Sequence, residues 1–137
     1  YTALNPDANR KDLGFLWSNV SRMDSGAEYR VMPSENRKKE DFQLLADEIE
    51  ILKPDTVIFL AGNDYNEEIE KHIGLKWTTK NERLQIHKPE IRVAGLPEDT
   101  YKVYHPRYLS TRKIYWDVID ELGSYMMAEN KLLNELT

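Results

Sequence analysis

The stretch that decides the fold is DTVIFLAG, at residues 55–62. Its centre, VIFL at residues 57–60, is an unbroken apolar run. A run of this length suits a strand that is covered on both faces, as in a parallel α/β sheet. We therefore expect residues 57–60 to form a buried interior strand, parallel to a second strand that holds Val103 and Tyr104.

The segment before this strand predicts a helix. Ser34 is its expected N-cap, and the helix has to end before Pro54, since the residue that precedes a proline avoids the helical conformation. Apolar residues recur between them at helical spacing, namely Phe42, Leu45, Ile49 and Leu52. Helix, turn and strand make up most of a βαβ unit, for which LGFLWSNV at residues 13–20 is the candidate first strand.

The rest of the chain predicts further short elements. Residues 64–72 have the pattern of a short helix with Gly74 just past its end, and a polar stretch then runs to Glu90. We expect short strands at residues 91–96 and 101–105, and a helix from residue 111 to about 122 with a helical tail to Leu136. The expected fold is one α/β domain over residues 1–137, a three-layer α/β/α sandwich with a short, mostly parallel central sheet.

Composition excludes several classes of site. The chain has no cysteine, and therefore no disulfide, no cysteine nucleophile and no thiolate-held zinc or iron–sulfur centre. Two of its three histidines, His72 and His87, have no partner at metal-ligand spacing. We expect no metal and no cofactor. Apolar runs stay far below the roughly 20 residues that span a bilayer, and no signal peptide opens the chain, so we expect a soluble, cytoplasmic protein without a membrane partner.

Charge is unevenly distributed along the chain. The net charge of −5 argues against an indiscriminate nucleic-acid binder, because phosphate affinity comes mainly from Lys and Arg. Residues 21–39, however, carry five basic residues against three acidic ones. Residues 101–115 carry no acid and four basic residues, Lys102, Arg107, Arg112 and Lys113. If the two segments share a face, they form a basic patch on an acidic protein; otherwise they are ordinary solvated charge runs.

His105 is the first candidate for chemistry. It lies in YHPRY, residues 104–108, where a predicted strand gives way to a loop and a helix, the place where open α/β sheets bind ligands. A histidine there can donate a hydrogen bond to an oxyanion, and Pro106 stiffens the turn that aims it. The alternative is a histidine that hydrogen-bonds loop carbonyls.

Asn19 is the second candidate. It ends an otherwise apolar segment, and a carboxamide at a strand end offers the fixed acceptor and donors that suit the edge of a base. The alternative is an asparagine in a turn or a helix cap.

In their order along the chain, these pieces resemble the uracil-DNA glycosylase superfamily between residues 13 and 122. WSNVSRMD at residues 17–24 is similar to the second strand of that family, and residues 30–35 are similar to the basic, proline-containing loop after it. LKPDTVIFLAG at residues 52–62 is similar to the third strand. VYHPRYLS at residues 103–110 is similar to the His-Pro motif, in the HPxYL form of the bacterial iron–sulfur branch.

This resemblance implies a domain that accepts a flipped base at the carboxyl ends of its strands and hydrolyses the N-glycosidic bond, with DNA, in particular uracil-containing DNA, as its partner. Asn19 would then pair with the pyrimidine edge, and His105 would stabilise charge on an oxygen of the departing base. The resemblance also implies DNA contacts from a loop that enters or clamps the groove and from phosphate-binding residues: Arg107, Tyr108 and Leu109 on the loop, with Arg112 and Lys113 on phosphates.

The sequence departs from the family in two places. The first motif, a strand and Gly-rich loop with the water-activating carboxylate, is not found before Trp17, and the start at Tyr1 without an initiator methionine leads us to expect an N-terminally cut fragment. The cysteines of the iron–sulfur branch are absent, so no cluster is implied. Two alternatives therefore stand: a non-catalytic nucleic-acid or nucleotide-binding module on the same fold, and a protein-interaction domain that uses its acidic surface.

Overall fold

The computed structural model describes residues 39–61, 63, 65–93 and 95–136, with side chains described between residues 42 and 126 apart from the gaps. The chain divides at residue 104, so that residues 39–104 belong to one compact unit and residues 105–136 to another. We call these the sheet unit and the helical unit. The candidate strand at residues 13–20, the expected cap Ser34 and the basic residues at 21–38 lie outside the described residues.

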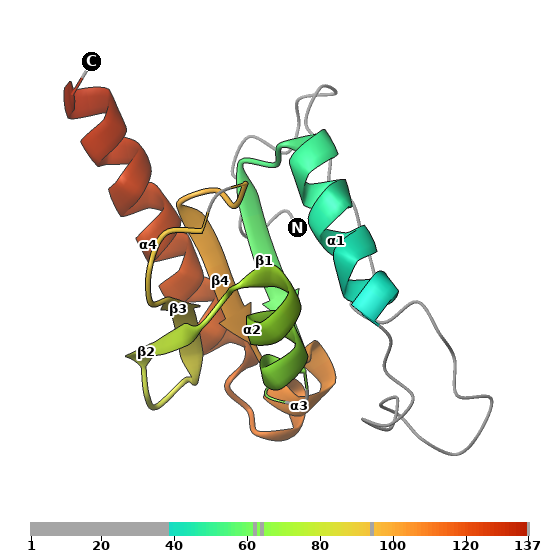
Figure 1. The fold of residues 1–137 in the computed structure, drawn as a ribbon. Coiled ribbons are helices and arrows are strands. Elements are labelled where there is room, and N and C mark those ends of the chain that lie inside the picture. Colours follow the sequence, from blue (N-terminus) through green and yellow to red (C-terminus); the bar gives the residue numbers. More distant parts are fainter. Residues whose placement is uncertain (1–38, 62, 64, 94, 137) are drawn as a thin grey trace. The chain divides into compact units, whose positions relative to one another are not determined.

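The sheet unit has a four-stranded sheet with the order β1-β4-β3-β2 (Figure 1). Strand β1, Thr56–Leu60, pairs in parallel with β4, Asp99–Val103, so that Leu60 lies beside Val103. This pairing confirms the prediction that residues 57–60 run parallel to the strand holding Val103. Strand β3, Ile86–Pro89, pairs antiparallel with β4 and with β2, Trp77–Asn81.

The sheet differs from the expected one in several respects. The fold is mixed α/β as predicted, but among the described strands only the β1–β4 pair is parallel, and β1 lies at the edge rather than inside. The predicted burial of residues 57–60 is also wrong except at Phe59, because an edge strand is covered less completely. Residues 91–93, 95 and 96 form no strand, so the prediction of a strand at residues 91–96 is wrong. The mostly parallel sheet and the three-layer sandwich are therefore not confirmed.

The β2–β3 hairpin occupies the stretch that we had interpreted only as polar. Its turn has neither glycine nor proline; instead the Oδ1 atom of Asn81 accepts from the backbone N–H of Leu84 at 3.0 Å, and Gln85 adopts a left-handed conformation with φ 53°. Strand β2 is largely exposed, so it lacks the apolar alternation of a half-buried strand. The usual turn and periodicity signals were both missing.

Helices α1, Lys39–Leu52, and α2, Asn66–Ile73, pack with β1 around one hydrophobic core. Phe42, Leu45 and Ile49 are buried as their spacing predicts, whereas Leu52 is half exposed where α1 ends. Gly74 ends α2 in a left-handed conformation with φ 76°, and its N–H donates to the carbonyl oxygen of Glu70. Trp77 and Phe59 meet edge-to-face in the same core, with ring centroids 5.3 Å apart.

The helical unit holds α3, Pro106–Thr111, and α4, Tyr115–Leu136. Strand β4 ends at Val103 rather than at His105, and residue 111 ends α3 rather than starting the long helix, so both predicted boundaries are shifted. The N–H of Ile114 donates to the carbonyl oxygen of Leu109 at 3.0 Å and closes α3 before α4 begins. None of the helices in the described ranges is long and apolar enough to cross a membrane.

Candidate functional site

His105 caps the amino end of α3. Its Nδ1 atom accepts a hydrogen bond from the backbone N–H of Arg107 at 3.2 Å, and its carbonyl oxygen accepts from the N–H groups of Tyr108 and Leu109. Pro106 occupies the first helical position, where its missing N–H leaves no intrahelical bond unmade. Within the described ranges the hydrogen bonds of His105 are therefore those of a helix cap rather than bonds to loop carbonyls, and the residue is exposed.

The cap fixes which ring nitrogen of His105 can donate. An imidazole nitrogen that accepts from an N–H carries no proton, so the neutral ring has its proton on Nε2. The Nε2–H group is then the donor that His105 presents. An exposed N–H donor at a helix start is one kind of group that can stabilise a developing oxyanion.

The basic residues after His105 lie on α3 and the turn that follows it, not on a loop. Arg107, Arg112 and Lys113 are all exposed, and the guanidinium of Arg112 lies over the Tyr108 ring, 5.3 Å from its centroid. Tyr108 is 39% exposed. The helical unit thus presents three cations and an aromatic ring to solvent, a combination suited to phosphate and base contacts.

Leu109 differs from these residues because its side chain is buried, only 2% exposed. A contact between Leu109 and the DNA groove would require α3 to leave its position. That contact stays a prediction, while the exposed residues on α3 need no such movement.

Lys102 is the remaining basic residue of the segment 101–115. It is buried in the sheet unit, only 1% exposed, and is therefore not available to phosphate in this structure. The Nζ atom lies 2.8 Å from Oδ1 of Asn63 and 2.8 Å from Oδ1 of Asn66. It also lies over the Trp77 ring, 5.5 Å from the centroid. The prediction of Lys102 as a surface charge is wrong, and the signal of its burial is its place between Tyr101 and Val103, both buried in β4.

The Lys102 cluster lies where β1 and β4 end. Asn63 follows β1, Asn66 begins α2, and Tyr104 follows β4. The hydroxyl of Tyr104 accepts a hydrogen bond from Nδ2 of Asn63 at 3.3 Å. Asn66 Nδ2 donates to Asn63 Oδ1 at 3.2 Å. These bonds join the carboxyl ends of the parallel strands, which is the edge where α/β sheets bind ligands.

Burial changes the acidity of two groups on this face of the sheet. Burial lowers the pKa of Lys102 to about 8, because the charged ammonium is removed from water. Burial also lowers the pKa of His87, and the positive charge of Lys102 lowers it further. Perturbed groups of this kind are enriched at functional sites, although structural networks also produce them.

Other expected or possible sites are less informative. Asn19, the predicted base-binding residue, lies outside the described residues, so its convergence with His105 stays a prediction. Within the described ranges, no three His, Asp or Glu side chains gather to hold a metal ion.

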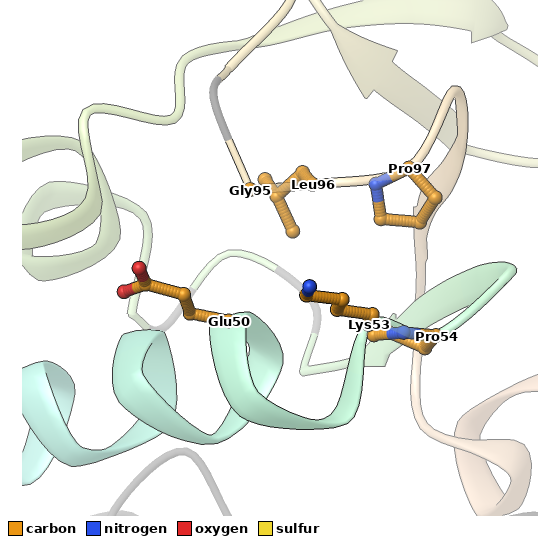
Figure 2. A pocket seen from close by; sticks show the side chains of 6 residues that line it. All are labelled: Glu50, Lys53, Pro54, Gly95, Leu96 and Pro97. Atoms are coloured by element: carbon orange, nitrogen blue, oxygen red, sulfur yellow. The ribbon is translucent and has the colours of Figure 1, made fainter.

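A shallow hollow of about 340 Å³ lies at the other end of the parallel strands, beside the residues that precede β1 and β4. Figure 2 shows Glu50, Lys53 and Pro54 on one side of it and residues 95–97 on the other. Its described lining is mainly apolar, and the two charged residues in that lining, Glu50 and Lys53, are exposed.

Comparison with protein-family models, curated proteins and solved structures finds no match to this chain.

Proposed function

We propose that this chain is a uracil-DNA glycosylase-like domain that excises a base from DNA by hydrolysing the N-glycosidic bond. The observation that carries the proposal is the capping bond from the N–H of Arg107 to Nδ1 of His105, which leaves Nε2 as the donor of the neutral ring; His105 follows β4 in the segment that resembles the His-Pro motif. The order of the four similar segments along the chain supports the same assignment.

In this proposal His105 acts on the leaving base. Breaking the N-glycosidic bond leaves the electron pair on the base, and negative charge develops on its carbonyl oxygen. A donor already aimed by the cap binds that oxygen more strongly as the charge grows, and therefore stabilises the transition state more than the ground state. Water supplies the hydroxyl that bonds to the sugar carbon, and its proton is taken up by the base or solvent.

DNA binding would use the helical unit. Arg107, Arg112 and Lys113 are exposed cations within seven residues along the chain, and Tyr108 beside them is suited to stacking. In the same proposal Asn19 binds the pyrimidine edge. Both contacts are expected to depend on extrusion of the target nucleotide from the duplex.

Among the described strands β1 lies at the edge of the sheet, a position that would allow a further strand to pair beside it. We propose that residues 13–20 form that strand, parallel to β1, within a three-layer α/β/α sandwich. Slow amide exchange at residues 13–20 is the expected result, and exchange at the rate of an unfolded peptide would contradict it.

The experiment for the proposed activity is excision from short DNA duplexes and single strands with one uracil, with thymine in the same position as the control. Release of free uracil and an alkali-labile abasic site is expected. The missing first motif favours one second candidate, a non-catalytic nucleic-acid-binding module, which predicts salt-dependent DNA binding without release of the base. A protein-interaction domain predicts neither.

A further inference from the structure

The orientation of two amides is determined by Lys102. An ammonium group has three donors and no acceptor, so the amide atom that faces it has to be the oxygen. The Oδ1 atoms of Asn63 and Asn66 each lie 2.8 Å from Nζ. Both carboxamides are therefore fixed with their oxygens inward, toward Lys102, and their nitrogens turned elsewhere.

Asn63 has no acceptor left to offer. Its Oδ1 accepts from Lys102 and from Nδ2 of Asn66, which occupies both lone pairs. Its Nδ2 has two hydrogens, one of which is donated to the hydroxyl of Tyr104. No residue in the described ranges engages the second hydrogen. Because Asn63 is exposed, the side chain presents only an N–H donor at this edge of the sheet.

Stability alone does not account for a lysine at position 102. Its ammonium is surrounded by two neutral amides and an aromatic ring, with no carboxylate partner among the described residues. A buried charge without a counter-charge destabilises a fold, and apolar residues of similar volume are often as good or better at such a position. What the ammonium provides, and a methionine would not, is a fixed orientation of Asn63.

The place of Asn63 agrees with a ligand contact. It lies between the carboxyl end of β1 and the start of α2, and its side chain reaches Tyr104, which follows β4. Figure 1 shows the neighbouring strands β1 and β4. Ligands of open α/β sheets bind outside the carboxyl ends of parallel strands. An exposed donor that is held in one orientation loses little freedom when it binds, which favours its use in recognition.

We propose that Lys102 is a positioning residue: it fixes the Asn63 carboxamide as an N–H donor that binds an acceptor oxygen of DNA at the carboxyl edge of β1 and β4. The inference rests on the proposed function in taking DNA as the ligand, but it does not require base excision. The acceptor is an oxygen of the base or of the phosphate backbone, since a carboxamide N–H binds either.

The test compares Asn63→Asp with Gln43→Glu. Each variant adds one negative charge to the sheet unit, so both are expected to repel DNA similarly at long range. Gln43 is exposed on α1 and lies outside the Lys102 cluster, whereas Asn63→Asp removes the outward donor and gives the ammonium a carboxylate partner. Binding of a duplex that carries a non-cleavable uracil analogue should weaken about tenfold in Asn63→Asp and change by less than about threefold in Gln43→Glu. Equal losses, or no loss in either, would overturn the inference.

A double-mutant cycle tests the role of Lys102 itself. Lys102→Met should weaken DNA binding in the wild-type background, because Asn63 is then free to rotate. In an Asn63→Ala background, Lys102→Met should have no further effect on DNA affinity. Additive losses would mean that Lys102 supports the fold without positioning Asn63. The Asn63→Ala variant also serves if Asn63→Asp does not fold, since it removes the donor without adding charge.

A third arm identifies the acceptor and separates the two proposals. If the loss in Asn63→Asp persists on duplexes with an abasic analogue, the acceptor is a phosphate oxygen; if it occurs only with the uracil analogue, the acceptor belongs to the base. Excision by the wild-type protein is measured separately. Specific loss of binding in Asn63→Asp without excision supports this inference and contradicts the proposed function, whereas excision with equal binding by all variants does the reverse. A wild-type protein that binds no DNA contradicts both.

Discussion

His87 and Lys102 lie directly opposite each other on the neighbouring antiparallel strands β3 and β4, and their side chains share one face of the sheet. The Nε2 atom of His87 is buried and has no hydrogen-bond partner among the residues that the structure describes, and its Nδ1 lies 3.3 Å from the hydroxyl oxygen of Thr79. The imidazole is therefore in an environment that favours its neutral form. Burial is the larger cause of its lowered pKa and the charge of Lys102 the smaller one.

Removing the charge of Lys102 should raise the pKa of His87. In Lys102→Met the repulsion is gone while burial remains, so the pKa of His87 is expected to move only part of the way to its usual value. Titration of the His87 ring protons by NMR measures it, with the exposed Lys71→Met as the control. An unchanged pKa in Lys102→Met would mean that the two groups do not face each other.

Lys102 should also make the fold more stable at alkaline pH. Burial lowers the pKa of Lys102 to about 8 in the folded protein, below its ordinary value of 10.5. Between these two values the unfolded chain holds the proton and the folded chain has lost it, so the free energy of unfolding rises with pH. Urea unfolding from pH 7 to 10.5 should show this rise in the wild-type protein relative to Lys102→Met. A difference that stays constant, or falls, would contradict the burial of Lys102.

Two glycines offer a matched test of the helical conformations. Gly74 ends α2 with φ 76°, and a Cβ atom there would meet nothing within 4 Å, so Gly74→Ala adds backbone strain alone. A loss of about 1 kcal/mol in the free energy of unfolding is expected. Gly123 lies inside α4 with equally open space, and Gly123→Ala should stabilise the protein by about 0.5–1 kcal/mol. Shifts of the same sign in both variants would show that one of these assignments is wrong.

The elements that the sequence predicts well are those whose local signals agree with their packing. The apolar run of β1, the spacing of Phe42, Leu45 and Ile49, and Gly74 after α2 each determine one element almost alone. The β2–β3 hairpin is not predicted because Asn81 is the single turn-forming residue of its turn, with no glycine or proline beside it, and because the left-handed conformation of Gln85 has no signal in the sequence.

The candidate site was only partly predictable. The position of His105 after a strand follows from the sequence, but its capping bond to the N–H of Arg107, which fixes the donor, depends on the start of α3. In the Lys102 cluster, Lys102 contacts Asn63, which lies 39 positions before it in the chain, and Asn66, which lies 36 positions before it. The periodicity of the sequence carries no information about contacts at such separations. The number of basic residues in a segment does not show which of them are buried, and Lys102 is buried because it lies within β4.

Three exposed cations of the helical unit should determine the salt dependence of DNA binding. Replacing Arg107, Arg112 and Lys113 together by Ala is expected to weaken binding and to lower the log–log salt slope on duplex DNA by about 0.9 per lost phosphate contact. The control replaces three exposed cations of the sheet unit, Lys71, Lys76 and Arg92, which changes the net charge equally. Equal slopes for the two triple variants would favour the protein-interaction alternative.

The most direct measurement is single-turnover excision of uracil by the wild-type protein, His105→Ser and His105→Ala. Serine is a strong N-cap and has no side-chain N–H, so His105→Ser should keep α3 and the stability of the fold while removing the Nε2–H donor, whereas His105→Ala should lose the cap as well, at about 1 kcal/mol. By analogy with the loss of one oxyanion donor, both variants should excise uracil on the order of 10²–10³-fold more slowly than the wild-type protein, with DNA affinity changed far less. Excision by His105→Ser at the wild-type rate would contradict the assigned role of His105, and a wild-type protein that releases no uracil would contradict the proposed function.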